Sequence, residues 1–197
     1  QGTGKQLAGY LGVDYERMRW RVAGINHMAW FLELASDGAD LYPQLLACLN
    51  DAETVAKDPV RFEILKHFGR FVTESSTHMA EYVPFFMKSE TEMKRLGIAE
   101  RSEKTFLDQA VRSREQLETA RADLAAGVPD LNRSHEYAAQ IIHAMETDTP
   151  CCIHGNVINS GLITNLPSGC CVEVPCLIDR AGMHPCYVGA LPTQCAA

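Results

Sequence analysis

The sequence of 197 residues has no apolar run close to the ~20 residues that a membrane-spanning helix needs. Its longest apolar runs, such as residues 28–32, are far shorter. It also has no charged N-terminal stretch followed by an apolar one, which is the pattern of an export signal. We therefore expect a soluble, cytoplasmic protein with no membrane partner.

Basic residues are too few and too scattered for a nucleic-acid-binding surface. Lys and Arg number 18 against 25 Asp and Glu, which gives a formal net charge of −7. Binding to a phosphate backbone needs a basic patch or stripe, and no basic block of that length occurs. We expect no nucleic-acid partner.

The sequence also lacks an initiator methionine. It begins with Gln1-Gly2-Thr3, and residues 194–197 resemble the beginning of a helix. Both ends look cut, so we expect that some residues required for the protein's chemistry lie outside this sequence.

Cysteine is rare before residue 150 and frequent after it. The adjacent pairs lack the two- to four-residue separation that brings two thiolates to one zinc ion, because neighbouring side chains on a strand point to opposite faces. Without an export signal, a disulfide framework is also disfavoured. We expect unpaired thiols that are mostly buried as small core residues, at Cys151, Cys152, Cys170, Cys171, Cys176, Cys186 and Cys195.

Apolar residues at steps of three and four predict helices over residues 5–11, 40–49, 59–67, 102–127 and 134–149. Another helix is predicted to end near Tyr82, because Pro84 disfavours a helical Val83. In the long segment the predicted apolar stripe is Phe106, Leu107, Ala110, Val111, Leu117, Ala120 and Leu124. In the segment capped by Ser134, the residues predicted to be buried are Ala138, Ile141, Ile142 and Met145.

Strand-like patterns lie at both ends of the sequence. They cover residues 20–25 and 28–34, joined by Asn26-His27, and residues 151–158, 171–178 and 183–188. Strands at the ends that enclose helices in the middle predict one α+β domain over residues 1–197, with an antiparallel or mixed sheet formed from the two ends.

The segment Gly24-Ile25-Asn26-His27-Met28-Ala29-Trp30 resembles a hallmark of the family 4 glycoside hydrolases, and its Ile and Met-Ala look most like the α-galactosidase branch. Further segments occur in the family's order with similar spacing, so the resemblance covers essentially the whole chain. They are Gly2-Thr3, Asp40-Leu41-Tyr42-Pro43, Glu74-Ser75-Ser76, Ala80-Glu81-Tyr82, Glu136-Tyr137-Ala138, Gly155-Asn156-Val157, Gly161-Leu162-Ile163, Asn165-Leu166-Pro167 and residues 170–175.

The resemblance implies a C-terminal α+β domain like that of lactate and malate dehydrogenases, preceded by a Rossmann domain that binds NAD. It also implies hydrolysis by redox-assisted elimination with NAD and Mn²⁺. Hydride leaves C3 of the sugar, a base removes the C2 proton, the C1 oxygen departs, water adds and hydride returns. NAD-dependent family 4 enzymes are exceptions to the rule of two catalytic carboxylates.

Four residues match functional positions of the family. His27 matches the metal-binding histidine, and imidazole is a suitable Mn²⁺ ligand. Tyr82 matches a tyrosine proposed to take the C2 proton, and its alternative is an amphipathic Tyr with its ring in the core. Asn26 and Asn156 match substrate-binding positions, although Asn26 is equally explained as a turn residue. We expect His27 at the rim of a concave site that Tyr82 also reaches.

Some family features are absent or altered. The resemblance places a Cys-His-Ser-Val block, whose Cys is the second metal ligand, just before Gln1, and cofactor-binding residues stay unknown without the upstream domain. Positions that depart from the family pattern are His135, His154, Ser160 and Thr164. We therefore expect the isolated chain to be inactive.

Three alternatives stay open at this point. The same family acts on other sugars, such as an α-galacturonide or a 6-phosphoglucoside, although the sequence has no clear cationic cluster for a phosphate. A 2-hydroxyacid dehydrogenase-like enzyme needs no metal, and a non-catalytic oligomerisation module needs no cofactor. We also expect a homo-oligomer, either a dimer or a tetramer.

Overall fold

The computed structural model describes residues 2–98, 103–127 and 136–196. Its framework is a sheet with the strand order β3-β2-β1-β6-β5, in which β4 also pairs with β2 and β7 with β6, all antiparallel. The strands are β1 (Met18–Ile25), β2 (Met28–Ser36), β3 (Ala39–Asp40), β4 (Phe71–Val72), β5 (Cys151–Ile158), β6 (Cys171–Asp179) and β7 (Gly182–Pro185).

The two ends of the chain build this sheet together, as predicted. β1 and β2 form a hairpin whose last pair is Ile25 with Met28, and β1 meets β6 where Gly24 lies opposite Glu173. The short strands β3 and β4 were not predicted. They are only two residues long, and a pattern needs more residues than that to be visible.

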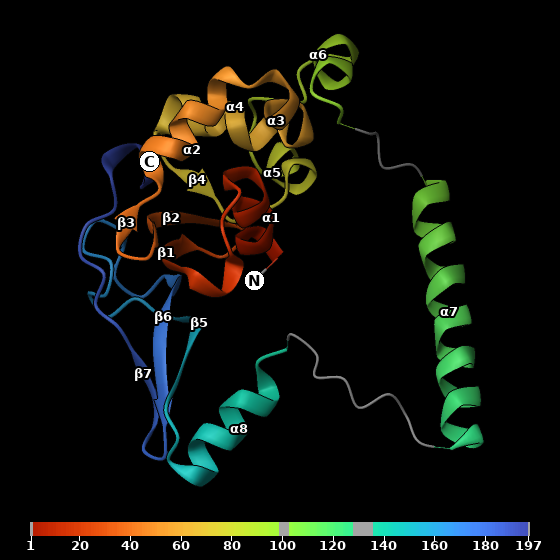
Figure 1. Cartoon of the computed structure of the whole chain (residues 1–197), viewed down its shortest axis with the longest axis vertical. Coiled ribbons are helices and arrows are strands. Elements are labelled where there is room, and N and C mark those ends of the chain that lie inside the picture. The colour runs from red at the N-terminus through yellow and green to blue at the C-terminus, as the bar shows by residue number, and fades with distance from the viewer. Residues whose placement is uncertain (1, 99–102, 128–135, 197) are drawn as a thin grey trace.

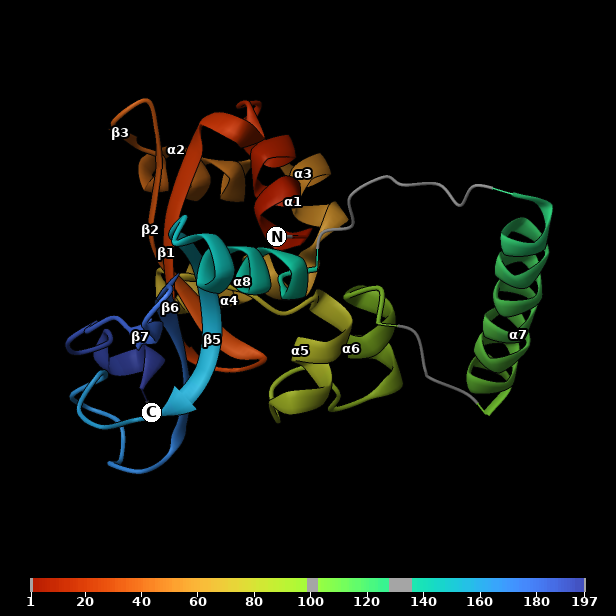
Figure 2. The same ribbon diagram turned by 90° about the horizontal axis from the view of Figure 1, so that it is seen from below.

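Helices surround the sheet unevenly (Figures 1 and 2). α1 to α5 gather near the β1–β2 hairpin, α8 lies beside β5 and β6, and α7 stands apart in both views. The α-helices are α1 (Gly2–Leu11), α2 (Tyr42–Ala47), α3 (Ala52–Lys57), α4 (Pro59–Phe68), α5 (Ser76–Tyr82), α6 (Glu90–Arg95), α7 (Glu103–Ala126) and α8 (Ala138–Thr147). Three short 3₁₀ turns are η1 (Tyr15–Arg17), η2 (Cys48–Asn50) and η3 (Thr193–Cys195).

Helix ends follow the local sequence. α5 stops at Tyr82 as predicted, and Ser75 caps its start by accepting a hydrogen bond from the backbone N–H of His78. α4 ends at Gly69, which adopts the left-handed conformation of a helix C-cap. α3 and α6 were not predicted, because each is too short to display a helical period.

The hairpin is buried on both faces. Successive residues of β2 alternate between two cores, since Ala29 and Phe31 pack with α1, α2 and α4 while Trp30 packs toward α5 and β6. This double burial explains why β2 is an almost unbroken apolar run rather than an alternating one. The hairpin is therefore rigidly held just behind the Asn26-His27 turn.

A buried ion pair links the helices beneath the hairpin. The guanidinium of Arg61 in α4 pairs with Asp58, and the two side chains are 2% and 4% exposed. Asp58 also accepts hydrogen bonds from Tyr10 and Ser76. Arg61 in turn donates to Gln6 in α1 at 2.7 Å. Together these contacts join α1, α4 and α5 around a buried ion pair, whose partners Gln6, Tyr10 and Ser76 lie nearer the surface.

Replacing Arg61 with Met is expected to lower the unfolding free energy by about 3–5 kcal/mol, because it leaves Asp58 as a buried charge without its cation. Urea denaturation measures the loss. The matched control is Arg95→Met, which removes an exposed pair with Glu92 on α6 and should leave stability almost unchanged. A loss for Arg61→Met as small as that of the control would contradict the account.

The predicted burial of α8 is wrong, and the predicted apolar stripe of α7 is exposed. Every residue of the apolar stripe on α7 is exposed, namely Phe106, Leu107, Ala110, Val111, Leu117, Ala120 and Leu124. In α8 only Ala144 is buried, Ile141 is intermediate, and Ala138, Ile142 and Met145 are exposed. Ser134 and His135 lie outside the described residues. Periodicity predicted the helices correctly, but it does not specify what covers an apolar face.

No helix of the described ranges is both long and apolar enough to cross a membrane.

The eight cysteines are free thiols, but the prediction that the late ones are mostly buried is wrong. Only Cys176 and Cys195 are buried, Cys151 and Cys170 are intermediate, and Cys152, Cys171 and Cys186 are exposed. On β6 the reason is strand alternation, because Cys176 shares the inward face with Val172, Val174 and Ile178 while Cys171 lies on the opposite face.

Candidate active site

The centre of the candidate site is the two-residue turn that joins β1 to β2. Ile25 and Met28 are the last paired residues, so Asn26 and His27 form the whole loop. His27 has a φ of 68°, which is uncommon for a residue with a side chain. The amide oxygen of Asn26 accepts a hydrogen bond from the backbone N–H of His27 at 2.9 Å. Asn26 therefore holds the turn in which His27 is displayed.

Gly24 permits the tight end of this hairpin. Its φ is 150°, and a Cβ atom placed on it would lie 2.8 Å from the Cα of Ala29 and 2.9 Å from the carbonyl oxygen of Met28. Both atoms belong to the backbone of the partner strand, so neither can rotate away. The close approach of β2 thus explains why the Gly-Ile-Asn-His segment begins with glycine.

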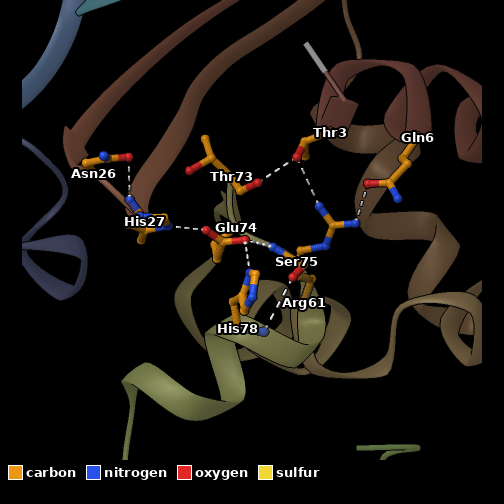
Figure 3. Close-up of polar contacts among 9 residues, drawn as sticks. All are labelled: Thr3, Gln6, Asn26, His27, Arg61, Thr73, Glu74, Ser75 and His78. Atoms are coloured by element: carbon orange, nitrogen blue, oxygen red, sulfur yellow. Dashed lines mark hydrogen bonds and ion pairs between the residues drawn. The ribbon is translucent and has the colours of Figure 1, made fainter. Parts of the chain in front are cut away.

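The side chain of Glu74 connects His27 with a second histidine (Figure 3). Its Oε2 is hydrogen-bonded to Nδ1 of His27, and its Oε1 lies 3.1 Å from Nδ1 of His78 and accepts the backbone N–H of Ser75 at 2.7 Å. Glu74 is 15% exposed and His27 is 50% exposed. The loop carrying Glu74 follows β4 directly and leads into α5.

These contacts determine the ionisation of Glu74. Burial by itself raises the pKa of this carboxyl, but the hydrogen bonds from His27, Ser75 and His78 outweigh it and lower the pKa to about 2. Glu74 is therefore a carboxylate, which accepts hydrogen bonds and donates none, throughout the neutral range.

Tyr82 lies next to His27, although the two residues come from different elements. Their ring centroids are 5.3 Å apart, and the ring of His78 is 6.4 Å from that of Tyr82. Tyr82 is the last residue of α5 and is 50% exposed. The structure thus brings together the two residues that the family resemblance assigned to one mechanism.

Asn156 and Glu173 lie on the sheet near this turn. They face each other across β5 and β6, and Glu173 is also opposite Gly24 of β1. Burial raises the pKa of Glu173, the charge of His27 lowers it, and the charge of Glu74 raises it. Directly opposed residues share a face of a sheet, so Asn156 and Glu173 point to the same side.

An apolar cavity of about 440 Å³ adjoins the two rings. Neither ring lines it, but residues within three positions of His27 or Tyr82 do, namely Ile25, Met28, Trp30, Met79, Val83 and Phe85. The expectation that His27 and Tyr82 share one cavity therefore stays a prediction, because the two rings contact each other beside this cavity without lining it.

His27 has the surroundings of a metal-binding histidine. A carboxylate on one ring nitrogen leaves the other nitrogen to bind an ion, and such carboxylate–histidine pairs are usual around metal ligands. Among residues 2–98, 103–127 and 136–196, no group of three or more His, Cys, Asp or Glu side chains has the arrangement to hold a metal ion. The described residues therefore fit one ligand of a metal site and not a complete set.

Sequence reasoning assigned no role to Glu74, His78 or Glu173. Glu74 and Glu173 lie within segments that matched the family, so the resemblance did contain a signal for them. His78 carried none. Only the structure shows that His78 belongs to the site, because α5 places it one turn before Tyr82 and beside Glu74.

Replacing Gly24 with Ala is expected to lower the unfolding free energy by about 1–3 kcal/mol, because the added Cβ overlaps the backbone of β2. It should also shift the amide resonances of the hairpin around His27. Urea denaturation and an amide spectrum measure both effects. The control is Gly9→Ala, because a Cβ there meets open space inside α1 and should be neutral or stabilising. Equal stability of the two variants would refute the close-approach argument.

The fold and site define an α+β domain of the dehydrogenase-like C-terminal type with a histidine displayed at a strand turn. Residues 22–197 match the family 4 glycosyl hydrolase C-terminal domain. The chain belongs to family 4 of the glycosyl hydrolases, as the resemblance indicated.

Two relatives are especially similar in sequence. The chain is 43% identical to an alpha-galactosidase of Bacillus subtilis (strain 168) over 195 residues, which cover 98% of the chain and 45% of that protein. It is 32% identical to an alpha-galactosidase of Rhizobium meliloti (strain 1021), covering 100% of the chain and 42% of that protein. The chain thus spans somewhat less than half the length of these relatives.

Solved structures share the fold at lower identity. One is described as a glucosidase, lplD, of Bacillus subtilis, with a TM-score of 0.78 and 24% identity over 99% of the chain and 49% of that structure. Another is a 6-phospho-alpha-glucosidase from gut microorganisms in complex with NAD and Mn²⁺, with a TM-score of 0.69 and 19% identity over 98% of the chain and 45% of that structure.

Proposed function

We propose that the protein to which this chain belongs hydrolyses α-galactosides with NAD and Mn²⁺, and that the chain supplies the sugar-binding and part of the metal-binding residues. The observation that carries the proposal is the contact of the His27 and Tyr82 rings, 5.3 Å apart, within a member of family 4. The relatives at 43% and 32% identity are both named alpha-galactosidase.

Each residue has a proposed role. His27 holds Mn²⁺ through one ring nitrogen, and Tyr82 removes the C2 proton of the sugar. Asn26 and Asn156 bind sugar hydroxyls through their amides. When bound, NAD supplies a hydride acceptor for C3 and Mn²⁺ supplies Lewis-acid polarisation of the sugar oxygens.

The second metal ligand is proposed to come from upstream. Thr3 donates a hydrogen bond at 2.6 Å to the carbonyl oxygen of Thr73, the residue before Glu74 (Figure 3). A Cys-His-Ser-Val block just before Gln1, as the family resemblance implies, would therefore join the chain beside the loop that contacts His27. A nucleotide-binding domain upstream of that block is part of the same proposal.

Charge favours an uncharged sugar over an anionic one. Glu74 and Glu173 both lie at the site, and neither they nor His27 form an ion pair with Lys or Arg within the described part of the chain. A phosphate or a uronic acid would face these carboxylates without a Lys or Arg side chain to compensate its charge. Relatives at lower identity include a probable 6-phospho-beta-glucosidase and two alpha-galacturonidases, which is why these sugars are the alternatives to test.

An oligomer of two or four copies is also proposed. The apolar side chains along α7 are exposed within the single chain described, and contacts between copies are one way to cover them.

The requirement for missing parts gives a direct assay. The 197-residue chain alone should not hydrolyse p-nitrophenyl α-galactoside, whereas the chain extended upstream by the proposed NAD-binding domain and Cys-containing block should do so only with both NAD and Mn²⁺. His27→Ala in the extended chain should reduce activity more than ~100-fold, because a metal ligand is lost. His67→Ala, which removes an exposed imidazole on α4, is the control. Hydrolysis by the bare chain that resists chelation would refute the proposal.

The role of Tyr82 can be tested separately. Tyr82→Phe in the extended chain should slow exchange of the C2 hydrogen with solvent by ~10²–10⁴-fold, because it deletes only the proposed base. Deuterium incorporation at C2 measures this step, and binding of the sugar should change little. Tyr187→Phe alters an exposed tyrosine after β7 and serves as the control. Undiminished exchange in Tyr82→Phe would mean that another group takes the proton.

A further inference from the structure

Glu74 has two oxygens in different surroundings. Oε1 has two donors, the backbone N–H of Ser75 at 2.7 Å and Nδ1 of His78 at 3.1 Å. Oε2 has Nδ1 of His27 as its partner. The carboxylate is therefore a bridge between two imidazoles that approach it through the same kind of nitrogen (Figure 3).

This bridge determines which nitrogen of each ring holds the proton. An ionised carboxylate only accepts hydrogen bonds, so a nitrogen bonded to it must carry hydrogen. Both histidines are thereby held with the proton on Nδ1. When the ring of His27 is neutral, its lone pair is on Nε2, and within the described residues Nε2 has no hydrogen-bond partner. A lone pair without a proton is what a metal ligand requires.

The position of Glu74 is itself fixed from two sides. The backbone N–H of Thr73 donates to the carbonyl oxygen of Ala29 at 2.9 Å, which ties the loop to β2. The hydroxyl of Thr3 bonds the Thr73 carbonyl oxygen and accepts from Arg61 at 3.3 Å. The loop that carries Glu74 is thus tied to β2, the strand that begins right after His27, and through Thr3 to Arg61 of the buried ion pair.

We propose that Glu74 is a positioning residue that locks His27 as the Nδ1–H tautomer and so reserves Nε2 for a divalent cation. The tautomer lock follows from the geometry alone, whereas its use for Mn²⁺ rests on the proposed function. His78 and Ser75 hold the other oxygen and keep the carboxylate aimed at His27.

The bridge makes an asymmetric prediction for Glu74→Gln. The amide oxygen of Gln has to take the Oε1 place, where two donors need an acceptor, which puts the amide NH₂ opposite His27. An NH₂ group donates, so Nδ1 of His27 must then become an acceptor and its proton must move to Nε2. His78 should keep its proton on Nδ1. This nearly isosteric substitution should therefore move the ring proton of His27 from Nδ1 to Nε2 and leave that of His78 on Nδ1.

Nitrogen-15 spectra of the histidine rings test this in the metal-free 197-residue chain at pH 8, above the ordinary imidazole pKa of about 6.5. The expected result is Nδ1–H for His27 in the parent chain and Nε2–H in Glu74→Gln, with His78 unchanged. Glu63→Gln is the matched control, since Glu63 pairs with the exposed His67 on α4 and should leave His27 as it was. Nε2–H for His27 in the parent chain would overturn the proposal, even if the variant failed to fold, and so would Nδ1–H for His27 in a folded Glu74→Gln.

Mn²⁺ affinity separates this inference from the proposed function. In the extended chain, Glu74→Gln should weaken Mn²⁺ binding by ~10–100-fold, as measured by the electron paramagnetic resonance signal of the free ion. If His27→Ala weakens binding and Glu74→Gln does not, the positioning role is wrong while the ligand role stands. If neither variant changes Mn²⁺ binding although the tautomer switches, the proposed function fails and the tautomer lock is upheld.

Discussion

The antiparallel contact between β1 and β6 is the constraint on which the candidate site depends. It joins residues from the first and last parts of the chain at Gly24 and Glu173. Closing so long a loop costs conformational entropy, although this cost grows only slowly with length. Burial of Ala23, Val172 and Val174 in one shared core offsets it. The result places the turn with His27 beside the face that carries Asn156 and Glu173.

Two glutamates at this site have opposite electrostatic surroundings. Glu74 receives three hydrogen bonds, and these outweigh its burial and keep it ionised, whereas Glu173 has no such donors among the described residues and burial raises its pKa. The same side chain thus serves as a fixed acceptor in one place and as a group that retains its proton to higher pH in the other. Titratable groups with divergent surroundings are characteristic of functional sites.

The family resemblance assigned His27 and Tyr82 to one site from the residues alone, and local patterns predicted the hairpin, the main strands and the end of α5. A two-residue turn between two β-like runs and a proline after Tyr82 are local signals, so they could be seen without a structure. The resemblance did not identify Glu74 as a partner of His27, because the two residues meet only when β4 pairs with β2. Burial of the α8 side chains was mispredicted for a related reason, since an apolar stripe does not specify which surface covers it.

The sequence by itself determined the secondary structure of the hairpin, the free state of the thiols and membership of the glycosyl hydrolase family, because these follow from local composition and ordered motifs. Only the tertiary structure decided which side chains surround His27. The tautomer of an imidazole depends on what its two nitrogens touch, and those contacts come from Glu74 on a different element. Position 24 likewise requires glycine because the backbone of β2 passes close to it across the hairpin. Residue spacing in the sequence does not reveal such a close approach between two backbones.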